Sequence, residues 1–270
     1  MQDIESVALQ AELWSVAEEL ADAARACILP YFRQIGLSAD NKDRDGFDPV
    51  TIADKAAEQV MRDILNKRRP QDAILGEEFG NSAGTSGLTW VLDPIDGTRG
   101  FISGTPTWGV LISLNDTSGP RLGIIDQPYI GERFCGGFAR AEVIGPHGTA
   151  ALQVRDTSDL SDAILFSTFP EVGTPEERNA FKAVMREVKL TRFGCDCYAY
   201  GLLAAGHIDL VIEASLNAYD IAAPIAVIEA AGGIVTDWKG GKAHNGGRAL
   251  AAATPELHAK ALKILKQTLS

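Results

Sequence analysis

Two aspartates, Asp93 and Asp96, stand three residues apart where an apolar stretch ends, and a Gly-Thr pair follows them at once. This Asp-Pro-Ile-Asp-Gly-Thr segment would bring two carboxylates to the end of a rigid strand, and carboxylate oxygens are the ligands that a hard divalent cation prefers. The amides of Gly97 and Thr98 are placed to open a helix and to face a phosphate. The segment by itself fits either a joint metal and anion site or a plain Asp-rich turn.

Three other places in the chain also offer a carboxylate near the end of an expected helix or strand. Asp54 follows the segment Asp-Pro-Val-Thr-Ile-Ala, Glu77 lies in Gly-Glu-Glu-Phe-Gly, and Asp220 begins an apolar helix that ends in Glu-Ala-Ala-Gly-Gly. Each has a simple structural explanation when taken alone. Asp54 would be a favourable charge in a first helical turn, Glu77 part of a solvated turn, and Asp220 a helix cap.

The apolar pattern predicts which elements carry these side chains. Helices are expected near residues 8–29 and 53–64, and short apolar runs predict a meander of strands at 73–75, 89–92, 108–114 and 122–125. After about residue 140 strands and helices alternate, which is typical of βαβ units. The expected strands there are 163–168, 189–193, 208–213 and 233–237, and the expected helices are 175–187, 195–205, 220–231 and 255–268. We therefore expect two halves, 1–140 and 141–270, of α+β and α/β style, packed as one compact unit.

The four carboxylate segments together resemble the inositol monophosphatase family of metal-dependent phosphatases. Their order and spacing, from Asp-x-Val-Thr-x-x-Asp to the late Asp with Glu-Ala-x-Gly-Gly, match over residues 45–245. The resemblance implies a layered αβαβα sandwich of the inositol monophosphatase and fructose-bisphosphatase type. It also implies Mg²⁺ dependence with two or three ions per active site, and a homodimer.

The resemblance also implies a role for each matched residue. Glu77, Asp93 and the carbonyl of Ile95 are expected to hold a first Mg²⁺, with Glu77 acting partly through water. Asp93, Asp96 and Asp220 are expected to hold a second. Thr98, hydrogen-bonded to Asp54, is expected to orient the attacking water and help to deprotonate it, and Gly97 and Thr98 to bind the phosphate.

The segments around Asp196 and Glu213 look like the histidinol-phosphatase branch of the family. Histidinol phosphate carries an ammonium group, and these two carboxylates are the candidates to pair with it. An inositol-1-monophosphatase or a nucleotide 3′-phosphatase is the alternative within the family. A catalytically silent metal-binding partner protein is the alternative outside enzymes, and it is disfavoured because every expected ligand is present.

Composition restricts the remaining possibilities. The 270 residues carry a formal net charge of −11, and the chain lacks an evident cluster of Lys and Arg, so nucleic acid is not an expected partner. The acidic start of the chain does not resemble a secretory signal, and no apolar run approaches the roughly 20 residues of a membrane span. Four scattered cysteines fit reduced thiols in the cytoplasm. Asn41, Asp43, Asp45 and Gly46 imitate the start of a calcium loop, although Ile52 stands where Glu is needed, and they could assist a third metal.

Overall fold

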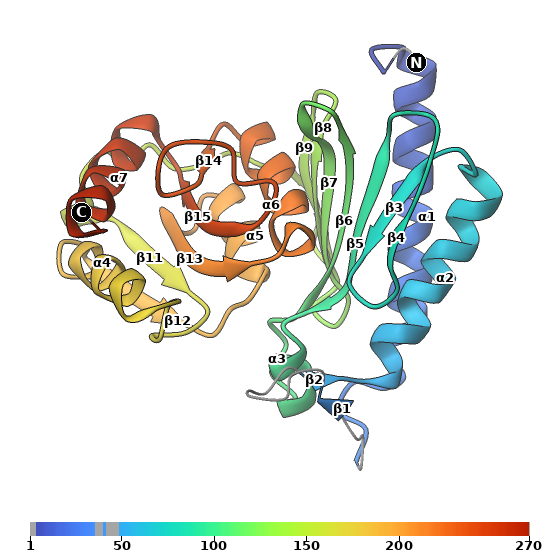
Figure 1. Ribbon diagram of the computed structural model, residues 1–270, viewed down its shortest axis with the longest axis horizontal. Coiled ribbons are helices and arrows are strands. Elements are labelled where there is room, and N and C mark those ends of the chain that lie inside the picture. Colours follow the sequence, from blue (N-terminus) through green and yellow to red (C-terminus); the bar gives the residue numbers. More distant parts are fainter. Residues whose placement is uncertain (1–3, 36–39, 42–48, 270) are drawn as a thin grey trace.

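A computed structural model describes residues 4–35, 40–41 and 49–269. Its helices and sheets alternate in five layers, αβαβα, as Figure 1 shows. The N-terminal helix lies in one outer layer and the C-terminal helix in the other, so the two ends of the chain are far apart. The expected layered sandwich is confirmed.

The first layer consists of two long helices, α1 (Val7–Ile28) and α2 (Ile52–Arg68). Apolar side chains at helical spacing, Leu13, Val16 and Leu20 among them, face the neighbouring sheet and are fully buried. Helix α1 ends just before Pro30, as expected, and α2 carries Asp54 in its first turn. A short two-stranded sheet, β1 (Asp40–Asn41) with β2 (Pro49–Val50), precedes α2.

The second layer is an eight-stranded sheet in the order β10-β9-β8-β7-β6-β5-β3-β4. Its strands are β3 (Ala73–Gly76), β4 (Gly80–Ser82), β5 (Thr89–Asp96), β6 (Gly109–Asp116), β7 (Gly119–Gln127), β8 (Glu132–Gly137), β9 (Arg140–Gly145) and β10 (Gly148–Ala151). Strands β5 to β10 form an antiparallel meander, but β3 pairs parallel with β5 and is followed by the edge strand β4. The strands β5, β6 and β7 of the meander were predicted, whereas β4, β8, β9 and β10 were not, and the antiparallel pairing expected at β3 was wrong. The sheet runs on to Ala151 rather than ending near residue 140. The intervening segment between β5 and β6 holds the short helix α3 (Thr98–Ser103).

The middle layer contains α5 (Tyr198–Ala204) and α6 (Ala218–Ala230), packed between the two sheets. Helix α6 approaches the first sheet closely because glycines face it. A Cβ atom at Gly123 would lie 2.4 Å from the Ala223 carbonyl oxygen, and one at Gly136 would lie 2.4 Å from the Val227 Cα. These glycines let the helix sit against the strands, and this contact helps to fix the position of Asp220 at its start.

The fourth and fifth layers are a five-stranded sheet and two outer helices. The strand order is β12-β11-β13-β15-β14, and β11 pairs parallel with β12 and β13 whereas β15 is antiparallel to both its neighbours. The elements are β11 (Ile164–Ser167), α4 (Pro175–Met185), β12 (Leu190–Phe193), β13 (Leu210–Leu216), β14 (Ile234–Thr236), β15 (Gly247–Ala252) and α7 (Pro255–Leu269), after the 3₁₀ turn Leu160–Asp162. The expected alternation of strands and helices is confirmed here, although β15 was not predicted.

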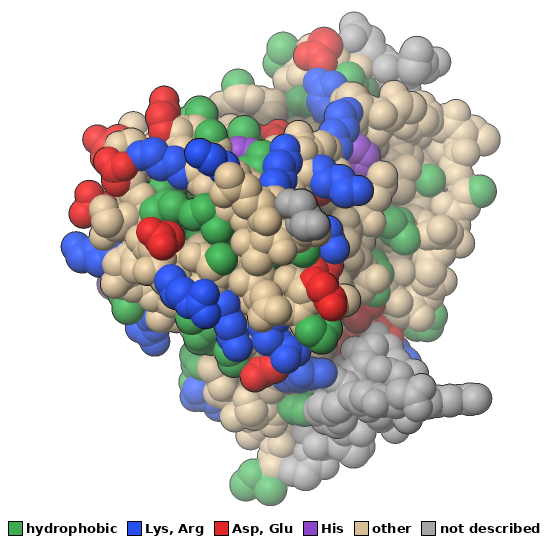
Figure 2. Space-filling view, turned by 60° about the vertical axis from the view of Figure 1, so that its left-hand side comes forward, with side chains coloured by type: hydrophobic (Ala, Val, Ile, Leu, Met, Phe, Trp, Pro, Cys, Tyr) green, Lys and Arg blue, Asp and Glu red, His purple; other side chains and the backbone are tan. Residues whose placement is uncertain are grey.

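Lys and Arg side chains lie among acidic and apolar ones on the side of the outer helices (Figure 2). A hollow of about 520 Å³ there is lined by charges of both signs, among them Arg186, Glu187, Lys260 and Lys263. The acidic balance of the chain is therefore not uniform over its surface. Within the part of the chain that the structure describes, none of the helices combines the length and the apolar character that crossing a membrane requires.

Candidate active site

A cavity of about 520 Å³ opens where the first sheet, the middle helices and the second sheet meet. Its walls come from the turn after β3, the end of β5, the start of α3, the loop after β11, the loop before α5, the end of β13 and the start of α6. Among the residues predicted from the sequence, nine line it: Glu77, Asp93, Ile95, Asp96, Gly97, Thr98, Asp196, Glu213 and Asp220. The tenth, Asp54, is fully buried in α2, with its carboxylate near Thr98.

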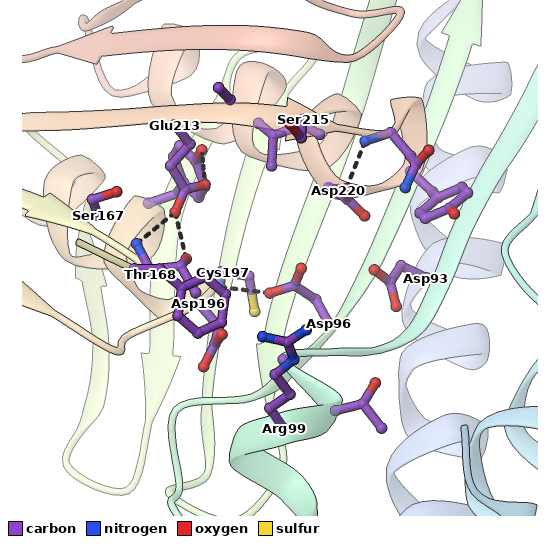
Figure 3. Close-up of a pocket in the computed structure, with 18 of the residues that line it drawn as sticks. Asp93, Asp96, Arg99, Ser167, Thr168, Asp196, Cys197, Glu213, Ser215 and Asp220 are labelled. Atoms are coloured by element: carbon purple, nitrogen blue, oxygen red, sulfur yellow. Dashed lines mark hydrogen bonds between the residues drawn. The ribbon is translucent and has the colours of Figure 1, made fainter. Parts of the chain in front are cut away.

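Three carboxylates converge at the centre of the cavity. Asp93, Asp96 and Asp220 each place one oxygen within 4.8 Å of the others, and Figure 3 shows them pointing toward a common space. Asp96 Oδ2 accepts a hydrogen bond of 2.6 Å from the amide of Cys197. Asp93 is 2% exposed, and its Oδ1 atom has no hydrogen-bond partner among the described residues. A buried acceptor without a donor is what a coordinated cation would explain.

The acidic cluster is electrostatically costly without a cation. Burial, reinforced by the neighbouring negative charges of Glu77, Asp96 and Asp220, holds the pKa of Asp93 well above its usual range. Burial likewise raises the pKa of Asp96 strongly, and that of Asp220 to about 7. Because a divalent cation would neutralise these like charges, the donor set fits a hard metal ion such as Mg²⁺.

Glu77 and Ile95 lie beside this cluster. Glu77 directly follows β3, and its amide donates a 3.2 Å hydrogen bond to the Leu92 carbonyl of β5. Its negative charge contributes to the raised pKa of Asp93 and of Asp54. The structure thus brings Glu77 next to Asp93, although it stands outside the group of three oxygens within 4.8 Å.

Asp54 and Asp220 occupy the same position in their helices and are oriented in the same way. Each is the third residue of its helix, and the Oδ2 atom of each accepts a hydrogen bond from the backbone amide of the N-cap residue, Thr51 at 2.9 Å or Asn217 at 2.6 Å. This is the acidic half of a capping box. Asp220 was expected to begin its helix, but α6 begins at Ala218 with Asn217 as its N-cap, so Asp220 is the third residue of the first turn.

Thr98 is the first residue of α3, and Gly97 adopts a left-handed conformation with a φ of 84° just before it. The Thr98 hydroxyl lies 3.1 Å from the Ile95 carbonyl oxygen and 3.5 Å from Asp54 Oδ1. A hydroxyl has one proton to donate, and the shorter contact is with Ile95. The expected contact between Thr98 and Asp54 is therefore present but long. Burial raises the pKa of Asp54 to about 6, which makes it a better proton acceptor than an ordinary aspartate.

Glu213 lines the cavity and is held by donors of this chain. It is 6% exposed, and its carboxylate accepts hydrogen bonds from the amide and hydroxyl of Thr168 and, at 2.7 Å, from the Tyr200 hydroxyl. Thr168 and Tyr200 were not predicted as site residues. The contact with Thr168 joins segments 45 residues apart, and no local pattern indicates it.

Asp196 packs against the turn that carries Asp96. A Cβ atom at Gly97 would lie 2.7 Å from the Asp196 Cγ atom, and Asp196 Oδ2 accepts a 3.1 Å hydrogen bond from the Thr107 hydroxyl. Burial raises the pKa of Asp196 to about 6. Arg99 also lines the cavity and stacks over the Phe169 ring, with 5.0 Å from its guanidinium carbon to the ring centroid. The cavity is therefore lined by the positively charged side chain of Arg99 as well as by carboxylates.

The residues named for a third metal are tested only in part. Asp43, Asp45 and Gly46 lie outside the described residues, and Asn41 is described only as part of β1. Their contribution to a third ion stays a prediction.

A pH dependence follows from the raised pKa values of Asp54, Asp196 and Asp220, which lie at about 6, 6 and 7 in the folded chain against a usual value near 4. The folded state binds these protons more tightly than the unfolded state does. The free energy of unfolding of the metal-free protein should therefore fall as pH rises from about 4 through 7. Melting temperatures in EDTA at pH 5 to 8 measure this trend. Saturating Mg²⁺ should weaken it, and identical curves with EDTA and Mg²⁺ would contradict the interpretation.

Comparison with known proteins agrees with the geometry. The profile of the inositol monophosphatase family matches residues 9–270. A histidinol-phosphatase of Streptomyces coelicolor is 35% identical over 261 residues, which are 93% of this chain and 96% of that protein. A bifunctional phosphatase of Arabidopsis thaliana, IMPL2, chloroplastic, is 43% identical over 84% of this chain and 64% of its own length.

Among solved structures, an inositol monophosphatase from Zymomonas mobilis matches with a TM-score of 0.83 and 38% sequence identity, covering 97% of this chain and 99% of that one. These relatives are named as phosphatases, which are phosphoric monoester hydrolases. The family profile spans nearly the whole chain, and the fold and the acidic site agree with it. The chain therefore belongs to the inositol monophosphatase family.

Proposed function

We propose that this chain is a Mg²⁺-dependent phosphatase that hydrolyses L-histidinol phosphate to L-histidinol and phosphate. Members of its family are metal-dependent phosphatases. The observation that carries the proposal is the convergence of the buried Asp93 with the half-buried Asp96 and Asp220, whose oxygens lie within 4.8 Å of one another. The identity of the ion, two or three Mg²⁺ per site, and the choice of ester are the parts proposed here.

The metal ligands divide into two sets. Asp93, Asp96 and Asp220 are proposed to hold one Mg²⁺. Glu77, Asp93 and the carbonyl of Ile95 are proposed to hold the other, with Asp93 shared because the negative charges of both Glu77 and Asp96 act on its carboxylate. When bound, the ions would neutralise the phosphate and lower the pKa of a water molecule.

The remaining polar groups act on the phosphate and the water. The amides of Gly97 and Thr98 line the same end of the cavity and are proposed to donate hydrogen bonds to the phosphate. The Thr98 hydroxyl is proposed to orient the attacking water, with Asp54 behind it as the proton acceptor. Phosphoryl transfer depends mainly on positioning and charge neutralisation, so no covalent nucleophile of the protein is required.

The choice of histidinol phosphate rests on two further carboxylates that line the cavity and on likeness to the Streptomyces histidinol-phosphatase over nearly the full length of both chains. Asp196 and Glu213 supply these carboxylates, which suit the ammonium group of histidinol. Because the Glu213 oxygens already accept hydrogen bonds from Thr168 and Tyr200, we assign the larger part of the charge recognition to Asp196.

An inositol-1-monophosphatase is the second candidate, favoured by the likeness to the Zymomonas mobilis structure. A nucleotide 3′-phosphatase, and a silent metal-binding partner protein, have no specific observation in their favour. Phosphate release with Mg²⁺ from histidinol phosphate, inositol 1-phosphate and a nucleoside 3′-phosphate separates these possibilities. We expect the highest kcat/KM with histidinol phosphate. Equal values for the first two esters would refute the substrate assignment, and no release from any ester would refute the enzymatic one.

Substitution of Asp196 tests the substrate assignment directly. Asp196→Asn should raise KM for histidinol phosphate about tenfold, the equivalent of ~1.4 kcal/mol of lost charge pairing, and should change KM much less for an ester of an uncharged alcohol, such as inositol 1-phosphate. Steady-state kinetics with both esters on the same preparation provide the comparison. If both KM values rose in parallel, Asp196 would have only a structural part in the site.

A further inference from the structure

The turn that carries Glu77 wraps around a single buried carboxylate, that of Glu58 on α2. Glu58 is 0% exposed. Its Oε2 atom accepts a 2.6 Å hydrogen bond from the amide of Glu78, and its Oε1 atom accepts one of 3.2 Å from the amide of Phe79. The two amides that follow Glu77 are thus both bound to one side chain from another layer of the fold.

Arg62, one helical turn after Glu58, completes this arrangement. Its Nε atom donates a 2.7 Å hydrogen bond to Glu58 Oε1. The two ends of its guanidinium group donate to the Gly80 carbonyl and, at 2.9 Å, to the Ser82 hydroxyl. The pair therefore contacts the turn both where it leaves Glu77 and where it enters β4.

Gly76 makes room for the carboxylate. A Cβ atom at this position would lie 2.0 Å from Glu58 Oε1 and 2.8 Å from the Arg62 guanidinium group. Glu58 thus reaches the backbone immediately before Glu77 as well as the backbone immediately after it. Any residue larger than glycine at position 76 would have to displace the carboxylate.

Stability alone does not explain why Glu58 and Arg62 form a buried ion pair here. Removing two charges from water is energetically costly, and well-packed apolar side chains often stabilise a fold as well as such a pair does. What apolar side chains cannot supply is acceptors for the amides of Glu78 and Phe79. The geometry points to a positioning role, in which the Glu58 and Arg62 pair holds Glu77 beside Asp93 and so sets the affinity of the site for its metal. This inference rests on the proposed function of Glu77 as a metal ligand.

Helix α2 carries two carboxylates that contact elements of the site. Asp54 and Glu58 are four residues apart on α2, one turn of the helix, so both can face the first sheet. Asp54 approaches Thr98, and Glu58 holds the turn after β3. The relative positions of the proposed proton acceptor and of one proposed metal ligand are therefore determined by one rigid element.

Glu58→Gln tests this role. It keeps the shape of the side chain but presents an NH₂ group to a site built from donors. Substitutions that disturb the support of a metal ligand weaken binding by about 10- to 100-fold, and we expect the Kd for Mg²⁺, measured by calorimetry on the metal-free protein, to rise at least about tenfold. KM for the ester at saturating Mg²⁺ should change little.

Asp72→Asn is the matched control. Asp72 directly precedes β3, whereas Glu77 directly follows it, and Asp72 is 6% exposed. Like Glu58, it accepts a hydrogen bond from an arginine, Arg69 at 2.8 Å, and one from a second donor, Trp90 at 3.0 Å. Both variants should lower the melting temperature, but only Glu58→Gln should raise the Kd for Mg²⁺. An unchanged Kd in Glu58→Gln, or an equal rise in both, would overturn the positioning role.

A second variant covers the case in which Glu58→Gln does not fold. Arg62→Lys keeps the positive charge but loses the forked contacts with Gly80 and Ser82. Like Glu58→Gln, it should raise the Kd for Mg²⁺. An unchanged Kd in that variant would equally overturn the inference. The wild-type protein separates this result from a failure of the proposed function, because a wild-type chain that binds no Mg²⁺ would refute the metal assignment itself.

Discussion

Asp93→Asn should reduce phosphate release by more than about 100-fold, since even indirect supports of metal ligands cost about 10- to 100-fold. Asp93 is the carboxylate that both proposed ion sites share, and a neutral amide is a poor ligand for a hard cation. The metal-free variant should melt at a higher temperature than the wild type, because the substitution removes one of several like charges that are buried together. Calorimetry should find Mg²⁺ binding strongly weakened.

Asp126→Asn is the contrasting variant. Asp126 is also a fully buried aspartate, but it is paired with Arg25 and Arg133, each at 2.7 Å, and does not line the active-site cavity. Breaking a buried pair destabilises the fold by about 3–5 kcal/mol, so this variant should melt at a lower temperature and still bind Mg²⁺. If Asp93→Asn also lowered the melting temperature of the metal-free protein and kept its Mg²⁺ affinity, Asp93 would be a structural residue and the proposed site would be wrong.

Thr98→Ala should lower kcat by about 100-fold or more, the usual scale of a proton-transfer group, while leaving the Kd for Mg²⁺ nearly unchanged. The expected loss has two sources, the orientation of the water and the path for its proton toward Asp54. Rapid-quench or steady-state measurement of kcat, together with calorimetry of Mg²⁺ binding, distinguishes a loss of chemistry from a loss of metal.

Thr98→Ser is the conservative counterpart because it keeps the hydroxyl and removes only a methyl group. Most of the activity should return with serine. Equal kcat values for the alanine variant and the wild type would remove Thr98 from the mechanism, and equally low values for alanine and serine would assign the effect to packing at the start of α3.

The carboxylates that line the site were predictable from the motifs that carry them. Asp54 could be explained as a favourable first-turn charge and Asp220 as a helix cap, or each as a functional carboxylate, and these explanations seemed to compete. In the structure one side chain can serve both purposes, since the oxygen that accepts from Thr51 or Asn217 leaves the other oxygen available to the proposed site. A capping box at the start of a helix is therefore no argument against a role in chemistry.

The supports of the site were not predictable, because they depend on contacts between distant segments. The hydrogen bonds of Glu58 to the turn after Glu77 span 20 and 21 residues, and those of Glu213 to Thr168 span 45. Helical spacing places Glu58 on one face of α2, but it does not say what that face meets. The parallel pairing of β3 with β5 was missed for the same reason, since pairing between strands is decided by the whole sheet and not by either strand alone.

The cavity takes its lining from different parts of the chain. The carboxylates of the proposed metal site come from β5, α6 and the turn after β3, whereas another part of the lining comes from residues 168–173 after β11 and from the end of β13. A change in that second part alters the shape and charge that the departing alcohol meets and leaves the reacting end intact. Because of this division, replacement of a short loop can change which ester the fold accepts, while the carboxylates of the proposed metal site stay the same.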